Sequence, residues 1–216
     1  NVGNLLGLEH GERTVVSWSV NPPRVVAMEE LKTASLAERL AAAALVARHG
    51  YPVGFHMDPM IHHEGWREGY ARLVDSLLDA VPSERIAWIS IGSLRFLPEM
   101  KATMEARFPR SELRHGELVR GDDGKMHYLR PLRVEMYGLV IDRLRKRLRG
   151  CASAPIVYLC MEPPEVWKRV FGEAAPSNAE LEHRFAENYH RRFVPGELPR
   201  PDIEAYRSFT GEGCVT

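Results

Sequence analysis

Cysteine is scarce in this chain, which has three in 216 residues. Cys151, Cys160 and Cys214 are odd in number and widely spaced, so the sequence supports neither a disulfide framework nor a cysteine-based metal site. No apolar run approaches the roughly 18 residues of a membrane span, and the first residues lack the basic and apolar pattern of a signal peptide. We therefore expect a cytoplasmic protein with reduced thiols and no membrane partner.

An excess of charge of either sign is also missing, because 29 basic residues balance 29 acidic ones. No net electrostatic field therefore attracts the protein to nucleic acid or to an anionic membrane. The sequence does not exclude a local basic groove. The Gly-x-Ser-x-Gly elbow of hydrolases and the glycine-rich loops of nucleotide-binding folds do not occur. What is present is a globular composition with 44% hydrophobic residues, enough for one large domain or one domain with a tail.

Apolar runs alternate with helical stretches along the chain. Strands are predicted at 14–20, 52–57, 86–91 and 155–161, and helices at 35–49, 65–81, 98–108, 131–149, 163–171 and 179–193. Residues 114–130 break this rhythm with two short runs around Gly121-Asp-Asp-Gly124, which predict a hairpin excursion. The pattern is that of an α/β fold, a partial parallel β/α barrel with its site at the carboxyl ends of the strands.

Titratable side chains gather at the end of the second predicted strand: His56, Asp58, His62, His63 and Glu64. Neutral imidazole and carboxylate both bind divalent metals, so a metal-dependent barrel hydrolase that uses the three histidines and Asp58 is one hypothesis. Against it, the cluster has no fixed helical spacing such as His-Glu-x-x-His. The alternative is structural: Glu64 caps the next helix and His63 packs in the loop.

Small polar residues follow the first and third predicted strands. Alternation places Ser17, Ser19 and Asn21 on one face, where they suit hydrogen bonds to a ribose or a carboxylate. In the alternative interpretation, Ser17 is a core hydroxyl whose hydrogen bonds are made within the protein, and Asn21 caps the turn that follows. Gly92 and Ser93 either let backbone amides approach a ligand or form a tight turn.

Two more residues are candidates for chemistry. Arg95 could pair with a phosphate or with a nearby carboxylate. Cys160, at the end of the fourth predicted strand, is either a radical hydrogen donor or nucleophile, or a small buried hydrophobic residue.

Five pieces of the sequence carry a resemblance to a known family: Ser17-Trp-Ser-Val-Asn-Pro22, Thr33-Ala-Ser-Leu-Ala-Glu-Arg-Leu40, Gly50-Tyr-Pro-Val-Gly-Phe55, Ile61-His-His-Glu-Gly-Trp-Arg-Glu-Gly-Tyr70 and Ile91-Gly-Ser-Leu-Arg-Phe96. In this order they resemble the spore photoproduct lyase family of radical S-adenosylmethionine enzymes. The likeness runs from Asn1 to about Arg149. Beyond Cys151, the stretch from Val157 to Trp167 resembles the broader lyase-like group.

The resemblance implies a partial barrel that holds a [4Fe-4S] cluster through a Cys-x3-Cys-x2-Cys loop and binds S-adenosylmethionine at the fourth iron. Reductive cleavage then gives a 5′-deoxyadenosyl radical, which acts on a thymine lesion in DNA. This chain has no such loop, and a cluster needs its thiolates. We therefore expect residues 1–172 to be the carboxyl-terminal part of the barrel, residues 173–216 to be a terminal helix and irregular tail, and the chain alone to be inactive.

The same resemblance, read with the residue patterns, assigns roles to two sets of residues. The cofactor-binding set is Ser17, Ser19, Asn21, His56, Gly92 and Ser93. The substrate-binding set is Asp58, His62, Lys125, Tyr128, Arg130 and Arg133, in which the hairpin offers charge and a stacking ring to an extruded lesion. A solvated hairpin without that role is the alternative.

The spore enzymes have an apolar and a small residue where His56 and Asp58 stand, which favours a lyase-like relative with another substrate. Three functions stay open on the sequence. The first is a monomeric radical enzyme acting on a DNA photolesion or a related substrate. The second is the metal-dependent hydrolase, and the third is a DNA-binding module without catalysis.

Overall fold

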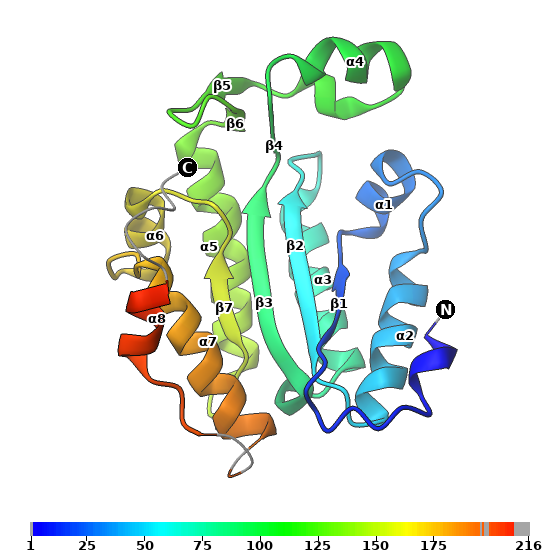
Figure 1. Cartoon of the computed structure of the whole chain (residues 1–216). Helices are drawn as coiled ribbons and strands as arrows, with labels where there is room; N and C mark the ends of the chain where they lie inside the picture. The colour runs from blue at the N-terminus through cyan, green and yellow to red at the C-terminus, as the bar shows by residue number, and fades with distance from the viewer. Residues whose placement is uncertain (1, 195, 197–198, 210–216) are drawn as a thin grey trace.

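A four-stranded parallel sheet forms the centre of the computed structural model, which describes residues 2–194, 196 and 199–209 (Figure 1). Its strands, in spatial order, are β1 (Val16–Ser19), β2 (Val53–Met60), β3 (Ile86–Ser93) and β7 (Ile156–Leu159). Each neighbouring pair is parallel. The predicted α/β fold with part of a parallel barrel is therefore confirmed.

Eight α-helices surround the sheet within the described residues. They are α1 (Pro23–Glu29), α2 (Leu36–Arg48), α3 (Trp66–Ala80), α4 (Met100–Arg107), α5 (Arg130–Arg147), α6 (Pro164–Phe171), α7 (Asn178–Phe193) and α8 (Ile203–Phe209). Figure 1 shows α3 and α5 side by side behind the sheet, α7 in front of β7, and α8 packed on the outer side of α7. None of these helices combines the length and hydropathy that a membrane crossing requires.

The main core lies between the sheet and the helices behind it. Successive side chains of a strand alternate between its faces, and Phe55, Met57 and Ile89 have no exposed surface. They share one buried cluster with Leu73 of α3 and Val140 of α5. The helices thus hold one face of the sheet, and the residues between these positions point to the other face.

Two helices begin with a capping box, in which a serine and a glutamate three residues later satisfy each other's backbone amides. At α2, the Ser35 amide donates to Glu38 at 2.8 Å and the Glu38 amide donates to the Ser35 hydroxyl at 3.3 Å. At α7, Ser177 and Glu180 make the same pair of bonds, at 2.9 and 3.2 Å. Both helices were predicted, and these caps fix where they begin.

The hairpin predicted at 114–130 is present as β5 (Leu118–Arg120) and β6 (Met126–Tyr128). It forms a separate antiparallel sheet because β6 also pairs with β4 (Arg95–Phe96), a strand that the sequence did not predict. Helix α1 was also missed: Pro23 occupies its first turn, where the lost amide costs no hydrogen bond. Figure 1 shows the hairpin and α4 above the carboxyl ends of the main strands.

The tail differs from the irregular stretch that we expected. Helix α8 lies within it, and the Asp202 carboxylate accepts a hydrogen bond from the Glu204 amide at its first turn, at 3.0 Å. Residues 210–216, with Cys214, lie outside the described part of the chain. The domain boundary at residue 172 stays a prediction.

Candidate functional site

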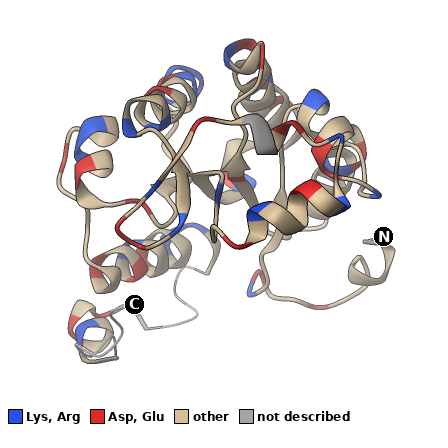
Figure 2. Cartoon of the chain, turned by 90° about the horizontal axis from the view of Figure 1, so that it is seen from above, with Lys and Arg blue, Asp and Glu red and all other residues tan. Residues whose placement is uncertain are grey.

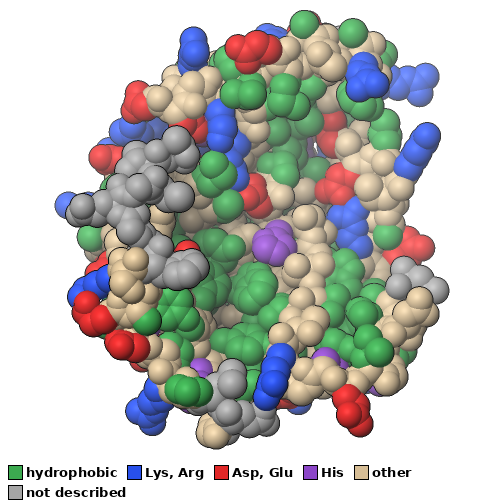
Figure 3. Space-filling view, in the orientation of Figure 1, with side chains coloured by type: hydrophobic (Ala, Val, Ile, Leu, Met, Phe, Trp, Pro, Cys, Tyr) green, Lys and Arg blue, Asp and Glu red, His purple; other side chains and the backbone are tan. Residues whose placement is uncertain are grey.

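The face of the sheet opposite α3 and α5 is hollowed. Figure 3 shows hydrophobic side chains around a histidine near the middle of this face. Strand alternation places Gly54, His56 and Asp58 of β2 here, beside Trp88 and Ser90 of β3. β2 reaches Met60 and β3 reaches Ser93. Both strands are therefore longer than predicted, and Gly92 lies within β3 rather than in a turn after it.

One row of polar residues crosses all four strands of the sheet. Ser19, His56, Ser90 and Tyr158 are register partners on β1, β2, β3 and β7. Nδ1 of His56 lies 2.7 Å from the Ser90 hydroxyl. Burial lowers the pKa of His56, and the nearby Asp58 carboxylate opposes this shift. The imidazole is therefore neutral at neutral pH.

A second polar cluster lies next to this row, towards the carboxyl ends of the strands. The Arg95 guanidinium donates to both oxygens of Asp58, at 3.2 and 3.0 Å, and approaches the Cys160 sulfur at 3.5 Å. A Cβ on Gly92 would lie 2.8 Å from the Asp58 carboxyl carbon and 2.9 Å from an Arg95 nitrogen. Glycine at position 92 therefore makes room for this ion pair.

The Cys160 thiol is protonated at neutral pH. Burial and the adjacent Asp58 carboxylate raise its pKa to about 11, against the opposing effect of Arg95. It is consequently a weak nucleophile and an intact source of hydrogen. This environment disfavours the nucleophile, and both the hydrogen-donor role and the purely structural role of Cys160 stay predictions.

We expect iodoacetamide to alkylate Cys160 far more slowly than the exposed Cys151 at pH 8. A thiol of pKa about 11 is roughly one part in a thousand thiolate at that pH, and its rate should rise steadily until the pH passes its pKa. Mass spectrometry of a Cys214→Ser chain measures both rates, and a Cys151→Ser variant is the control. Equal rates at pH 8 would show that Cys160 is not protected in this way.

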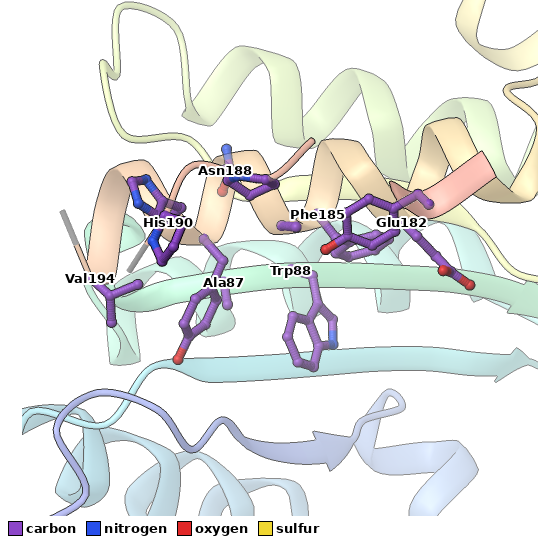
Figure 4. Close-up of a pocket in the computed structure, with 12 residues that line it drawn as sticks. Ala87, Trp88, Glu182, Phe185, Asn188, His190 and Val194 are labelled. Carbon is purple, nitrogen blue, oxygen red and sulfur yellow. The ribbon is translucent and has the colours of Figure 1, made fainter. Parts of the chain in front are cut away.

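Helix α7 covers the β3 and β7 side of the hollow. The Phe185 ring lies 4.9 Å from that of Tyr158 and 6.0 Å from that of Trp88. Between α7, α8 and β3 is a largely apolar pocket of about 580 Å³, whose wall includes Ala87 and Trp88 of β3 and Phe185 and Asn188 of α7 (Figure 4). The sequence predicted α7 as a helix, but it gave no signal that α7 lies on this face.

The opposite side of the hollow ends at β1, an edge strand. A groove of about 800 Å³ runs beside it, lined by Ser17, Ser19, Glu30 and Arg39 among others. Both serines are exposed, so Ser17 is not the core hydroxyl of the second alternative, and a cofactor role for the two serines stays a prediction. Arg39 forms an ion pair with Glu30 at 2.5 Å and donates to the Ser19 carbonyl at 2.9 Å. The groove therefore presents the two serine hydroxyls, next to an ion pair that is largely buried.

Asn21 and Ser93 do not face the hollow as open binding groups, in contrast to what we expected. The Asn21 amide donates to Glu30 at 2.9 Å and to the Pro59 carbonyl at 3.1 Å, and its oxygen accepts from Tyr70 at 2.8 Å. Asn21 is 4% exposed and Ser93 is 1% exposed. Tertiary packing uses Asn21 to join β1, β2 and α3, a role that alternation along one strand does not reveal.

The hairpin differs from the expectation in a similar way. Tyr128 is 3% exposed, and its hydroxyl accepts from the His62 amide at 3.1 Å. Arg133 is buried, donates to the Tyr128 carbonyl at 3.1 Å and forms an ion pair with Glu162. Neither side chain is offered to a ligand. Of the other two predicted substrate cations here, Lys125 is half-buried and Arg130, at the start of α5, is exposed.

The metal hypothesis finds no support in the described residues, where no group of three or more His, Cys, Asp or Glu side chains could hold an ion. His56 is bound to Ser90 and Asp58 to Arg95. His63 Nδ1 lies 2.7 Å from the Glu64 carbonyl. The residues that lie close together in the sequence therefore bind separate partners in the structure and do not form one metal site.

Charges of both signs surround the mouth of the hollow. Figure 2, seen from the carboxyl ends of the strands, shows acidic and basic residues interspersed on the surrounding elements. On the hairpin, Lys125 lies 4.0 Å from Asp123. Among the described residues on this side, Figure 2 therefore shows no continuous basic surface of the kind that a sequence-independent DNA-binding module needs.

Comparisons with known proteins agree with this geometry. A family model described as spore photoproduct lyase matches residues 1–130. The chain is 35% identical over 115 residues to the spore photoproduct lyase of Bacillus subtilis (strain 168), which covers 52% of this chain and 34% of the relative. The corresponding match in Clostridium acetobutylicum is 29% identical over 113 residues. The chain thus spans about a third of the length of these relatives.

Solved structures extend the match to most of the fold. A spore photoproduct lyase complexed with dinucleoside spore photoproduct is 27% identical with a TM-score of 0.63, over 74% of this chain and 48% of the other. A variant with bound AdoMet and dinucleoside spore photoproduct gives a TM-score of 0.60 over 74% and 47%. Family model, sequence and structure agree, and the chain belongs to the spore photoproduct lyase family.

Proposed function

We propose that this chain supplies the carboxyl-terminal half of a radical S-adenosylmethionine barrel, and that its hollow binds the adenosyl cofactor and a DNA photolesion or a related substrate. The main support for this proposal is that His56, Asp58 and Cys160 lie together on one hollowed face of the sheet. The membership of the chain in this family is the second support. Solved relatives bind AdoMet and dinucleoside spore photoproduct. Residues 1–172 would form the half-barrel and residues 173–216 a terminal segment.

An iron-sulfur cluster does not fit on this chain. A [4Fe-4S] cluster with an open iron needs three thiolates. Cys151 lies beside Ser83, whereas Cys160 lies beside Asp58 and Arg95, and the described residues contain no set of three metal-binding side chains. We therefore assign the cluster to a Cys-x3-Cys-x2-Cys loop on another segment of polypeptide.

The adenosyl cofactor does fit beside β1. Ser17 and Ser19 offer hydroxyls, and the Glu30–Arg39 pair offers charge, along a groove large enough for a nucleoside. When bound, S-adenosylmethionine supplies the radical chemistry, and the protein binds, orients and excludes water. We also assign His56, and the part of β3 that contains Gly92, to the cofactor-binding part of the hollow.

The proposed substrate side is the cluster of Asp58, Arg95 and Cys160. Its ion pair is largely buried, with side chains 19% and 14% exposed, so it holds the thiol in a fixed place. His62, Lys125 and Arg130 stay candidates for outer contacts with a nucleic acid. The oligomeric state is proposed to be a monomer.

The test is anaerobic reconstitution of this chain joined to, or mixed with, a segment that carries the triple-cysteine loop. We expect iron-sulfur absorbance for a single cluster and release of 5′-deoxyadenosine from S-adenosylmethionine. An Asp58→Asn variant should lose substrate turnover, because Arg95 and Cys160 lose their shared partner. An Arg67→Ala variant, which removes an exposed pair with Glu135 and a cation–π contact with Trp66, should keep it. If the assembled protein releases no 5′-deoxyadenosine, or if Asp58→Asn and Arg67→Ala behave alike, the proposal is wrong.

A further inference from the structure

Two cavities meet along helix α7. One is the largely apolar pocket of about 580 Å³ between α7, α8 and β3 (Figure 4), which we call the aromatic pocket. The other, of about 720 Å³, lies between α7 and residues 200–201, and we call it the basic groove. Asn188, His190 and Pro201 line both cavities. The pocket and the groove therefore form one continuous depression on the α7 side of the molecule.

The walls of the basic groove carry an excess of positive charge. Arg184 and Arg191 lie seven residues apart on α7, and therefore on one face of that helix. Arg200 adds a third guanidinium from the other wall. Arg191 and Arg200 are exposed, and neither makes an ion pair within the described residues; Arg184 makes only a long one with Glu173, at 3.8 Å. Glu187 is the one acidic side chain among the described residues of the wall. A bound anion would therefore meet guanidinium groups whose charge is not already compensated.

The aromatic pocket offers flat rings to a ligand. Four aromatic residues line it, and each is only partly buried: Trp88, Phe185, Tyr189 and Tyr206. The Phe185 ring is nearly perpendicular to that of Trp88, with ring centroids 6.0 Å apart. Partly exposed rings around one cavity are surfaces on which a nucleobase can stack. The volume of the pocket is also that of a small-ligand site.

Hydrogen bonds hold the end of α7 in this place. Arg192 donates to the carbonyls of Ser83 and Ile86, at 2.9 Å each, and so ties α7 to the start of β3. It also donates to the side-chain oxygen of Asn188, at 3.0 Å. The amide NH2 of Asn188 is then left as a donor between the two cavities. The walls are thus in place before a ligand binds, which reduces the cost of ordering them.

We propose that the two cavities bind single-stranded DNA, with its phosphates along the basic groove and one of its bases stacked in the aromatic pocket. A basic groove beside stacking rings is the combination that single-strand binding uses. The site adjoins the hollow, because Phe185 lines the pocket and its ring lies 4.9 Å from that of Tyr158. The strand would therefore be the one that continues from a substrate nucleotide in the hollow, a link that rests on the proposed function. The family model ends at residue 130, so α7 lies outside the part of the chain that it matches.

The phosphate contacts are tested by the salt dependence of binding. Fluorescence anisotropy of a labelled oligothymidylate of about ten nucleotides measures the affinity of the whole chain at several salt concentrations. Each phosphate contact to a single strand contributes about 0.7 to the slope of log K against log salt. The double variant Arg191→Ala with Arg200→Ala removes two cations, so we expect its slope to be smaller by about 1.4.

Lys146→Ala with Arg149→Ala is the matched control. It also removes two cations, but from a cavity of about 670 Å³ on α5 that has no aromatic ring among its lining residues. The slope of this double variant should equal that of the wild type. Equal slopes for the two double variants would show attraction to overall charge alone, and the proposal would be overturned.

The stacked base is tested separately. Phe185→Leu keeps an apolar side chain but removes the ring, so the affinity for oligothymidylate should fall by about fivefold or more. A strand of the same length without bases should bind the wild type more weakly than oligothymidylate does, and should bind wild type and Phe185→Leu equally. Circular dichroism shows whether Phe185→Leu is folded, and the salt slopes decide the proposal if it is not.

Two further results would overturn the proposal. The first is equal affinity of the wild type for the strands with and without bases. The second is thymidine or S-adenosylmethionine binding the pocket as tightly as the strand does, which would show a site for a free nucleoside. The titrations need neither a cluster nor S-adenosylmethionine, whereas the proposed function is measured by release of 5′-deoxyadenosine, so the two failures are distinguishable.

Discussion

Replacing Arg133 with alanine is expected to lower the free energy of unfolding by about 3–5 kcal/mol, because it leaves a buried carboxylate without its cation. The Glu162 side chain is 2% exposed and that of Arg133 is 9% exposed. Tyr137 also donates to Glu162, at 2.6 Å, but a neutral hydroxyl cannot compensate the charge. This pair joins the first turn of α5 to the loop after β7. Urea denaturation of the variant and the wild type measures the loss.

Arg130→Ala is the matched control for that prediction. Arg130 lies three residues earlier on the same helix and is exposed, so its removal should change stability by no more than about 0.5 kcal/mol. A double variant, Arg133→Met with Glu162→Gln, removes both charges and should recover much of the lost stability. If Arg133→Ala were as stable as Arg130→Ala, Arg133 would not be structural, and the substrate role that the sequence suggested would return.

Gly92→Ala is expected to destabilise the chain by about 1–3 kcal/mol, the usual range for overpacking. The new Cβ would meet the Asp58 carboxyl group at 2.8 Å and the Arg95 guanidinium at 2.9 Å, closer than real Cβ contacts. One partner of the ion pair must move, and Cys160 then loses its fixed neighbours. Thermal or urea unfolding measures the first effect. Faster alkylation of Cys160 at pH 8 measures the second.

Gly138→Ala tests whether any glycine substitution has this effect. Gly138 lies within α5, and a Cβ there meets nothing within 4 Å, so alanine should stabilise the helix by roughly 0.5–1 kcal/mol. Opposite signs for the two variants would support the packing argument. Equal stability of Gly92→Ala and the wild type, with unchanged alkylation of Cys160, would contradict it.

The sequence could predict the elements that depend on local pattern. The apolar run at Ile86 needs both faces covered, and the Ser35–Glu38 spacing caps a helix by itself. The sequence also predicted that His56 and Asp58 reach one end of a strand, because side-chain alternation is a local property. Helix α1 and strand β4 were missed, because Pro23 was interpreted as a stop and β4 exists only by pairing with the distant β6.

By itself, therefore, the sequence determined the parallel half-barrel, the family and the set of polar residues on β2 and β3. Only the tertiary structure decided which of them remain available to a ligand. Asn21, Tyr128 and Arg133 are bound by partners far away in the sequence. In contrast, His56 is paired with Ser90 and Asp58 with Arg95 on the hollowed face. The physical reason is that a buried polar group must find a partner, and folding rather than local spacing chooses which partner is within reach.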